Sequence, residues 1–439
     1  MTQEEALDIM KMGYNVFLTG PPGSGKTFLL NKYIEYLKEN HHPVAVTAST
    51  GIAATHMNGV TIHSWSGLGI KERLTDKDIR GLMKKPYLRK HFRNTNILII
   101  DEISMLNAAQ FDAVDRTCQY FKKSFEPFGG MQIICSGDFF QLPPINRDGK
   151  SKLVFESGSW KSMDMKICYL EEQHRHKDKY LFSLLNHIRN SNIGESKRML
   201  NDRGQFKDHL AAPTKLYTHN IDVDSVNSEE LMKIDSEEFI FHMTSSGKQK
   251  VVAALKKSCL APERLILKEG AKVMFIKNNF EVGYVNGTQG KVTGFDYDGL
   301  PIVETISGKS IVAKSSSWTV DEEGKIIAKI NQIPLRLAWA ITVHKSQGMN
   351  LDNAEIDLSK CFVEGMGYVA LSRLSSLAGL KLVAINDMAF CVDEKASIVD
   401  KELKKSSVKA GEELRKISGG EILNRQKQFL ASSELHLTW

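Results

Sequence analysis

Residues 20–27, GPPGSGKT, match the GxxxxGK-Ser/Thr spacing of a phosphate-binding loop. An apolar run, NVFLT, precedes this loop, and a segment with helical spacing, FLLNKYIEYLKEN, follows it. Glycines let backbone N–H groups approach phosphate oxygens, and the start of a helix adds partial positive charge. We therefore predict a nucleotide site in which Lys26 reaches the β- and γ-phosphates and the Thr27 hydroxyl binds Mg²⁺. A chance glycine turn is the alternative, and the flanking strand and helix argue against it.

Two further apolar runs end in residues suited to hydrolysis. NILII runs into Asp101 and Glu102, and the carboxyl ends of parallel strands are where α/β sheets bind ligands. We expect Asp101 to contact Mg²⁺ through water and Glu102 to deprotonate the attacking water. MQIIC runs into SGDFFQLPP, whose prolines hold Gln141 where its amide could contact the γ-phosphate. An ordinary proline-terminated turn explains Gln141 equally well.

The C-terminal half adds a second set of polar residues. His344, Lys345 and Gln347 end the apolar run LRLAWAITV, and Arg373 is expected at the start of a helix in GYVALSRL. An arginine from a second lobe commonly completes a phosphoryl-transfer site. Each residue alone could be an ordinary surface group. At this point a kinase, a GTPase and a motor all remain open.

These residues need a large scaffold. The 439 residues leave room for about three domains. Short β-forming runs separated by turn residues indicate a small all-β barrel at 272–332, inserted into α/β sequence. The chain has no run of some 18 apolar residues, so we expect no membrane span. Six cysteines without CxxC pairing favour reduced thiols in the cytoplasm.

The net charge of +6 is unevenly placed. Residues 71–93 hold nine Lys or Arg against three Asp or Glu. Such a segment is either a solvated helix face or a landing site for nucleic acid, and charge alone does not decide between them.

Nine motif blocks resemble, in order, the Pif-type DNA helicases, which are RecD-like motors of superfamily one. They are GPPGSGKT, TASTGIAA, TIHSWSG, IIDEISM, FGGMQIICSGDFFQLPP, EEQHRHKD, VNGTQGKV, LAWAITVHKSQGMNL and GYVALSRL. The resemblance covers about residues 3–384. It implies an α/β fold of two RecA-like P-loop lobes with parallel sheets, with ATP between them and single-stranded DNA across their tops.

The resemblance also implies domain boundaries. Lobe one is expected at 1–165, with a basic wedge insertion at about 67–93. Lobe two is expected at 166–271 and 333–392, with an SH3-like barrel at 272–332 inserted in it. The tail at 393–439 matches nothing, and its charge predicts solvated helices or partial disorder.

Site residues carry over by position. Gln3 resembles the adenine-reading glutamine, and Arg175 and Arg373 resemble the two γ-phosphate arginines. The other nucleotide contacts implied are Gly20, Gly23, Ser24, Gly25, Phe28 and Gly348. The implied contacts to the DNA backbone are Thr47, Ser49, Thr50, Gly51, His63, Ser64, Asn286, His344 and Lys345. Hydroxyls, glycine N–H groups and histidines of this kind contact phosphates without reading bases. For Trp65 we favour a place in the core over base stacking.

The leading hypothesis is an ATP-driven helicase or translocase on single-stranded DNA, acting on forked or 5′-tailed duplexes. Its 5′-to-3′ polarity comes only from the resemblance, and a preference for G-quadruplexes or RNA–DNA hybrids stays open. We expect a monomer in solution, and an oligomer on DNA stays open. Because the phosphate loop begins at Gly20, the long N-terminal extension of eukaryotic relatives is absent, which favours the cytoplasm of a bacterial or phage-infected cell over a mitochondrial or nuclear location. The rival hypothesis is an ATPase switch that clamps DNA without moving. A small-molecule kinase would leave HKSQG and the barrel unexplained.

Overall fold

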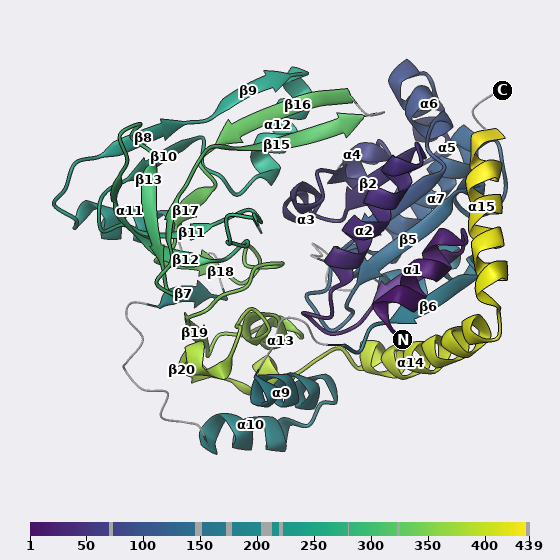
Figure 1. The fold of residues 1–439 in the computed structure, drawn as a ribbon. Helices are drawn as coiled ribbons and strands as arrows, with labels where there is room; N and C mark the ends of the chain where they lie inside the picture. The colour runs from purple at the N-terminus through teal and green to yellow at the C-terminus, as the bar shows by residue number, and fades with distance from the viewer. Residues whose placement is uncertain are drawn as a thin grey trace.

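The protein folds into two α/β lobes with an antiparallel β region beside the second (Figure 1). The computed structural model describes residues 1–69, 73–144, 152–172, 178–202, 213–218, 223–279, 281–322 and 325–435. Among these residues, none of the helices is both long and apolar enough to cross a membrane.

Lobe one is built on a six-stranded parallel sheet in the order β3-β2-β4-β5-β1-β6. Its central strands β4 and β5 are buried along their whole length, as expected for parallel strands covered on both faces. The boundary predicted at residue 165 is wrong, because β6 pairs with β1 from Asn15–Met165 to Thr19–Tyr169. The strands are β1 Asn15–Thr19, β2 Val44–Ala48, β3 Val60–Thr61, β4 Ile97–Asp101, β5 Gln132–Gly137 and β6 Met165–Tyr169.

The basic segment forms two short helices, α5 and α6, that pack on α7 of lobe one. The ring of Phe92 on α6 stacks on Phe121 with 4.3 Å between centroids and lies 4.7 Å from Trp65. Trp65 is buried, so the prediction that it belongs to the core is confirmed. The helices of this lobe are α1 Gln3–Lys11, α2 Lys26–Glu39, α3 Gly51–His56, α4 Ile62–Trp65, α5 Asp76–Met83, α6 Pro86–Arg93, α7 Ala108–Lys122 and α8 Gly158–Ser162.

Lobe two contains a smaller parallel sheet in the order β18-β7-β19-β20. Helices α9 and α13 pack against each other on this lobe. Its strands and helices are α9 Lys179–Arg189, α10 Ile193–Asp202, β7 Thr214–Tyr217, α11 Val223–Met232, β18 Ala340–Thr342, β19 Ala354–Leu358, α13 Met366–Leu371 and β20 Leu380–Ile385. Short 3₁₀ turns occur in both lobes. Those of lobe one are η1 Ile103–Met105, η2 Pro127–Gly130 and η3 Val154–Glu156, and those of lobe two are η4 Leu377–Gly379 and η5 Asp387–Phe390.

The inserted β region is longer than the predicted barrel at 272–332. A five-stranded antiparallel sheet, β14-β13-β12-β11-β17, supplies the feature expected of an SH3-like barrel. However, β9 pairs with β16, so strands upstream of 272 belong to the same insertion. Helix α12 lies between β8 and β9 and the barrel strands in the sequence, so the sequence pattern did not indicate that β8 and β9 belong to the insertion. The elements are β8 Phe239–His242, β9 Thr244–Gly247, α12 Gln249–Ser258, β10 Arg264–Leu267, β11 Lys272–Phe275, β12 Gln289–Phe295, β13 Pro301–Thr305, β14 Ser310–Val312, β15 Ser316–Glu322, β16 Lys325–Gln332 and β17 Leu335–Leu337.

The C-terminal segment forms two helices, α14 Glu394–Arg415 and α15 Gly419–Leu435, that belong to lobe one. Helix α14 packs along β6, where the Ser407 hydroxyl accepts a hydrogen bond from the Tyr169 N–H at 3.0 Å. Helix α15 packs on α1, where Gln426 donates to Asp8 at 3.0 Å (Figure 1). The prediction that this segment is helical is confirmed for 394–435. The prediction that its helices are solvated is wrong, because α14 buries one face, which includes Leu403 and Leu414.

Replacing Phe92 with Ala is expected to lower the free energy of unfolding by about 3–5 kcal/mol, because a fully buried ring leaves a cavity between α6 and α7. The matched control is Phe125→Ala, since Phe125 is fully exposed and its loss should change the free energy by less than about 0.5 kcal/mol. Urea titration of both variants measures the difference. Equal midpoints would show that Phe92 does not hold the basic helices in place.

Candidate nucleotide site between the lobes

The phosphate loop joins β1 to α2 and is shaped by glycine. At Gly20, φ is +143°, and an added Cβ would lie 2.3 Å from the Leu170 carbonyl oxygen, so no larger residue fits. The Lys26 ammonium donates to the carbonyl oxygens of Gly20 at 2.7 Å and Pro21 at 3.1 Å. The Gln3 amide donates to the Ser24 carbonyl at 3.2 Å. This hydrogen bond holds helix α1 against the loop, and it places Gln3, the predicted adenine contact, beside the loop.

The two predicted acidic residues lie at the end of β4, beside the loop. Glu102 has φ of 52°, a left-handed conformation that is uncommon outside glycine. Its backbone carbonyl accepts a hydrogen bond from the Ser49 hydroxyl at 2.6 Å, which fixes this turn. Burial and the charge of Asp101 raise the pKa of Glu102, and the positive charges of Lys26 and Arg373 oppose that rise. A carboxylate with a raised pKa is suited to accept a proton from water.

The residues present suit Mg²⁺ held together with a nucleotide. Thr27 and Asp101 line the same cavity and offer a hydroxyl and a carboxylate. Magnesium usually takes one or two protein oxygens and completes its shell with water and phosphate. The part of the chain that the structure describes holds no group of three or more His, Cys, Asp or Glu residues arranged for a metal. A shared site with phosphate therefore fits better than a dedicated protein cage.

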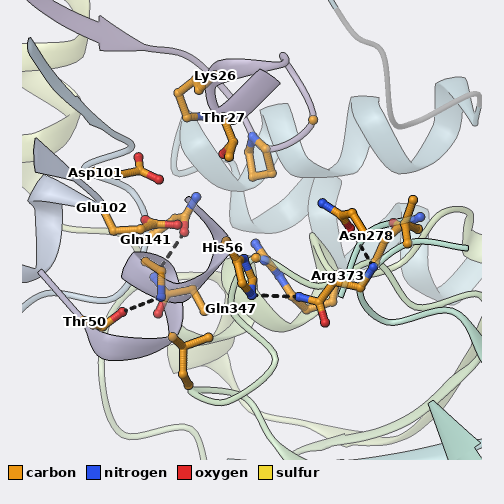
Figure 2. Close-up of a pocket in the computed structure, with 18 of the residues that line it drawn as sticks. Lys26, Thr27, Thr50, His56, Asp101, Glu102, Gln141, Asn278, Gln347 and Arg373 are labelled. Atoms are coloured by element: carbon orange, nitrogen blue, oxygen red, sulfur yellow. Dashed lines mark hydrogen bonds between the residues drawn. The ribbon is translucent and has the colours of Figure 1, made fainter. Parts of the chain in front are cut away.

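A cavity of about 600 Å³ joins the loop to the second lobe (Figure 2). Both lobes and the insertion contribute polar side chains to its lining, and Phe28 adds a ring that is 61 % exposed. The predicted residues brought together here are Gly23, Gly25, Lys26, Thr27, Phe28, Thr50, Asp101, Glu102, Gln141, Asn286, His344, Lys345, Gln347, Gly348 and Arg373.

Gln141 lies at the boundary between the lobes. Its Oε1 accepts a hydrogen bond from Gln347 Nε2 at 3.4 Å. The neighbouring side chains Phe140 and Leu142 are buried in the core of the second lobe, although both follow a strand of the first. An ordinary surface turn would not insert two apolar side chains into another lobe. The geometry therefore argues against an ordinary surface turn, and the contact of Gln141 with the γ-phosphate stays a prediction.

Arg373 is buried at the cavity, just after α13 rather than at the start of a helix as predicted. Its Nε donates to the Val369 carbonyl at 3.0 Å and its Nη2 to the Ser372 hydroxyl at 2.8 Å. Arg175, the other predicted γ-phosphate arginine, lies outside the described residues.

Several predicted DNA contacts are placed differently. Thr47 is wrong as a DNA contact, because it is fully buried and its hydroxyl donates to the Ile99 carbonyl at 2.6 Å. The Ser49 hydroxyl is engaged by Glu102, so it braces the acidic turn instead. Thr50 caps α3, whose first residue is Gly51, by accepting from the Ala53 N–H at 3.3 Å. His63 and Ser64 lie on α4 and are outside the cavity lining.

The structure adds His56, Asn278 and Asn350 to the cavity. The Asn286 Nδ2 atom lies 3.2 Å from the His56 Nε2 atom and links α3 of lobe one to the insertion. Burial lowers the pKa of His56 to about 4, so its ring is neutral near pH 7. No spacing rule marks this pair, because the two residues are 230 positions apart.

A parallel sheet with a phosphate loop after β1, carboxylates at the end of β4 and a second lobe closing the cavity together define a two-lobed P-loop ATPase. The family model described as PIF1-like helicase matches residues 3–199, and that of the DNA helicase Pif1 2B domain matches 251–295. The second match begins within α12, consistent with an insertion that starts before 272.

Curated relatives and a solved structure agree with these family matches. An ATP-dependent DNA helicase Pif1 of Psychrobacter sp. is 43% identical over 99% of this chain and 75% of its own. The Bdellovibrio bacteriovorus helicase of that name is 37% identical over 90% and 89%. Bacteroides sp. Pif1 in complex with ADP-AlF4 superposes with a TM-score of 0.78 at 29% identity, covering 92% and 96%. The chain belongs to the PIF1-like helicase family and is an ATP-hydrolysing helicase, as its motifs predicted.

Two substitutions separate nucleotide binding from hydrolysis. Lys26→Ala should weaken ATP binding by about tenfold or more, because the loop loses its cation. Glu102→Gln should leave the affinity within about threefold and lower kcat by about a hundredfold, because the proton acceptor is lost. Binding is measured with a fluorescent ATP analogue and turnover by phosphate release. Glu35→Gln, on the exposed face of α2, is the control. Normal turnover in Glu102→Gln would remove Glu102 from the base role.

Proposed function

We propose that the protein moves 5′ to 3′ along single-stranded DNA and opens forked or 5′-tailed duplexes, driven by ATP hydrolysis with Mg²⁺. The observation that carries this proposal is the shared cavity, in which Lys26 of the phosphate loop and His344 and Lys345 of lobe two line one space. A nucleotide that draws the lobes together must also move the second-lobe residues assigned to DNA. Such coupling is what stepping along a strand requires.

Solved relatives support the proposed substrates. Bacteroides Pif1 has been seen bound to single-stranded DNA, in a structure that is 30% identical to this chain with a TM-score of 0.60. Another structure, 31% identical with a TM-score of 0.62, concerns unwinding at forked duplex DNA by two coordinating Pif1 helicases. The polarity rests on the family resemblance alone, as does any action on G-quadruplexes or RNA–DNA hybrids. We further propose a monomer in the cytoplasm of a bacterial or phage-infected cell.

The residues divide the work by lobe. Lys26 from lobe one and Arg373 from lobe two would place positive charge on opposite sides of the phosphates. Glu102 would hold the proton taken from water, and the Gln141–Gln347 contact would respond to the γ-phosphate. Magnesium, when bound, neutralises phosphate charge. Burial lowers the pKa of His344, so it would contact DNA phosphate as a neutral hydrogen-bond donor. Lys345 supplies the charge beside it.

A DNA-dependent switch that clamps a strand without moving would use the same hydrolytic residues. Strand separation distinguishes the two functions. With ATP, the protein should unwind a duplex bearing a 5′ single-stranded tail and leave a 3′-tailed duplex of the same sequence paired. Fluorescence of a released labelled strand measures this. Hydrolysis without release from either duplex would support the switch, and release from the 3′-tailed duplex alone would reverse the polarity.

Lys345→Ala should weaken binding of single-stranded DNA about equally for all base sequences, because a backbone contact reads no base. The slope of log affinity against log salt concentration should flatten by about 0.7, the value for one phosphate contact on a single strand. Lys360→Ala, exposed on the same lobe and outside the cavity lining, is the control and should leave the slope unchanged. Fluorescence anisotropy over a salt series gives both slopes, and an unchanged slope in Lys345→Ala would exclude the contact.

A further inference from the structure

A buried arginine ties the two lobes and the C-terminal helix together. Arg189 ends α9, and its Nη1 donates to both carboxylate oxygens of Asp138 at 3.2 and 3.1 Å and to the Tyr368 hydroxyl at 2.8 Å. Its Nη2 donates to the Tyr169 hydroxyl at 2.7 Å and to Asp400 at 3.0 Å. Two carboxylates thus neutralise one guanidinium, which offsets the cost of burying it.

The contacts form two matched halves around Arg189. Tyr368 donates its hydroxyl proton to Asp138 at 3.0 Å, and Tyr169 donates to Asp400 at 2.9 Å. Each tyrosine therefore accepts from the guanidinium and donates to a carboxylate. The Asp138–Tyr368 half leads to Gln141 and Arg373, which line the nucleotide cavity, whereas the Tyr169–Asp400 half joins β6 to α14.

On the cavity side, Asp138 shapes the turn that presents Gln141. Its carboxylate accepts the Phe140 N–H at 3.2 Å, and its backbone carbonyl accepts the Gln141 N–H at 3.1 Å. The guanidinium of Arg189 also lies 4.2 Å from the centre of the Phe140 ring. The position of Gln141 is therefore set by a turn that Arg189 holds from two sides.

Tyr368 is linked to Arg373 through hydrogen bonds of Ser372. The Tyr368 carbonyl accepts the Ser372 N–H at 2.9 Å, and the Ser372 hydroxyl accepts from Arg373. At the start of α13, Gly365 has φ of +79°, and an added Cβ would lie 2.6 Å from the Phe140 carbonyl oxygen. The helix that leads to Arg373 thus rests directly on the turn that carries Gln141.

We propose that Arg189 is a positioning residue that fixes the separation of Gln141 and Arg373 across the nucleotide cavity. It does so through Asp138 and Tyr368, while Tyr169 and Asp400 anchor the guanidinium to lobe one. The inference rests on the proposed roles of Gln141 and Arg373 at the γ-phosphate. It assigns to a residue outside the cavity lining the alignment of two groups supplied by different lobes.

The test compares Tyr368→Phe with Tyr169→Phe, which each remove one hydroxyl from the same guanidinium. Tyr368→Phe should lower kcat for ATP hydrolysis by about fivefold, with KM for ATP within about twofold, because alignment rather than binding is lost. Tyr169→Phe should keep kcat within about twofold. Thermal unfolding should shift similarly in both, since each loses equivalent hydrogen bonds.

Equal falls in kcat would overturn the proposal, because Arg189 would then only stabilise the fold. Unchanged kcat in both variants would overturn it too, as would a rise in KM for Tyr368→Phe with kcat unchanged. Hydrolysis is measured with and without a single-stranded oligonucleotide. Missing DNA stimulation in the wild-type protein counts against the proposed motor, whereas the ratio of the two variants decides this inference under either condition.

Discussion

A guanidinium buried between two lobes must be neutralised where it lies, and Arg189 meets that requirement with Asp138 and Asp400. An uncompensated buried charge would cost several kcal/mol, and Asp138 in the turn at 138–141 and Asp400 on α14 each supply a carboxylate to Arg189 on α9. Arg189 thereby joins α9 of the second lobe to the turn after β5 and to α14 of the first lobe. The nucleotide cavity then forms where the two meet.

Elsewhere the lobes meet through helix packing of α12 on α3, through Val60 against the second-lobe core, and through polar pairs beside the cavity. Gln141 meets Gln347 at 3.4 Å and His56 meets Asn286 at 3.2 Å, both through neutral side chains. The apolar cores are largely separate, and Phe140 and Leu142 are the members of the second-lobe core that flank Gln141. Neutral contacts of this kind exchange readily with water or ligand, because their net contribution is about 1 kcal/mol each. A buried ion pair therefore joins the lobes at Arg189, whereas neutral hydrogen bonds join them across the cavity.

Local spacing predicted the parts of the site that a short segment determines. The loop at 20–27, the acidic pair after β4 and the residues 344–348 all follow from a strand and the turn that ends it. Long-range partners could not be read, since nothing near Thr47 indicates that its hydroxyl bonds a neighbouring strand. The packing of the C-terminal helices on lobe one could not be predicted for a related reason. Their composition is that of a solvated helix, and only the surface of β6 reveals which face is buried.

The place of Asp400 in the chain bears on how the protein is made. It binds Arg189 across 211 positions, and Tyr169 of the last lobe-one strand across 231. A ribosome delivers the phosphate loop, both acidic residues and Arg189 long before α14 emerges. Until then the Arg189 guanidinium has the Asp138 carboxylate as a partner but lacks the Asp400 contact. A growing chain can therefore form the Asp138–Tyr368 half of the Arg189 network first, and the half that joins β6 to α14 is completed only when residues 394–415 emerge.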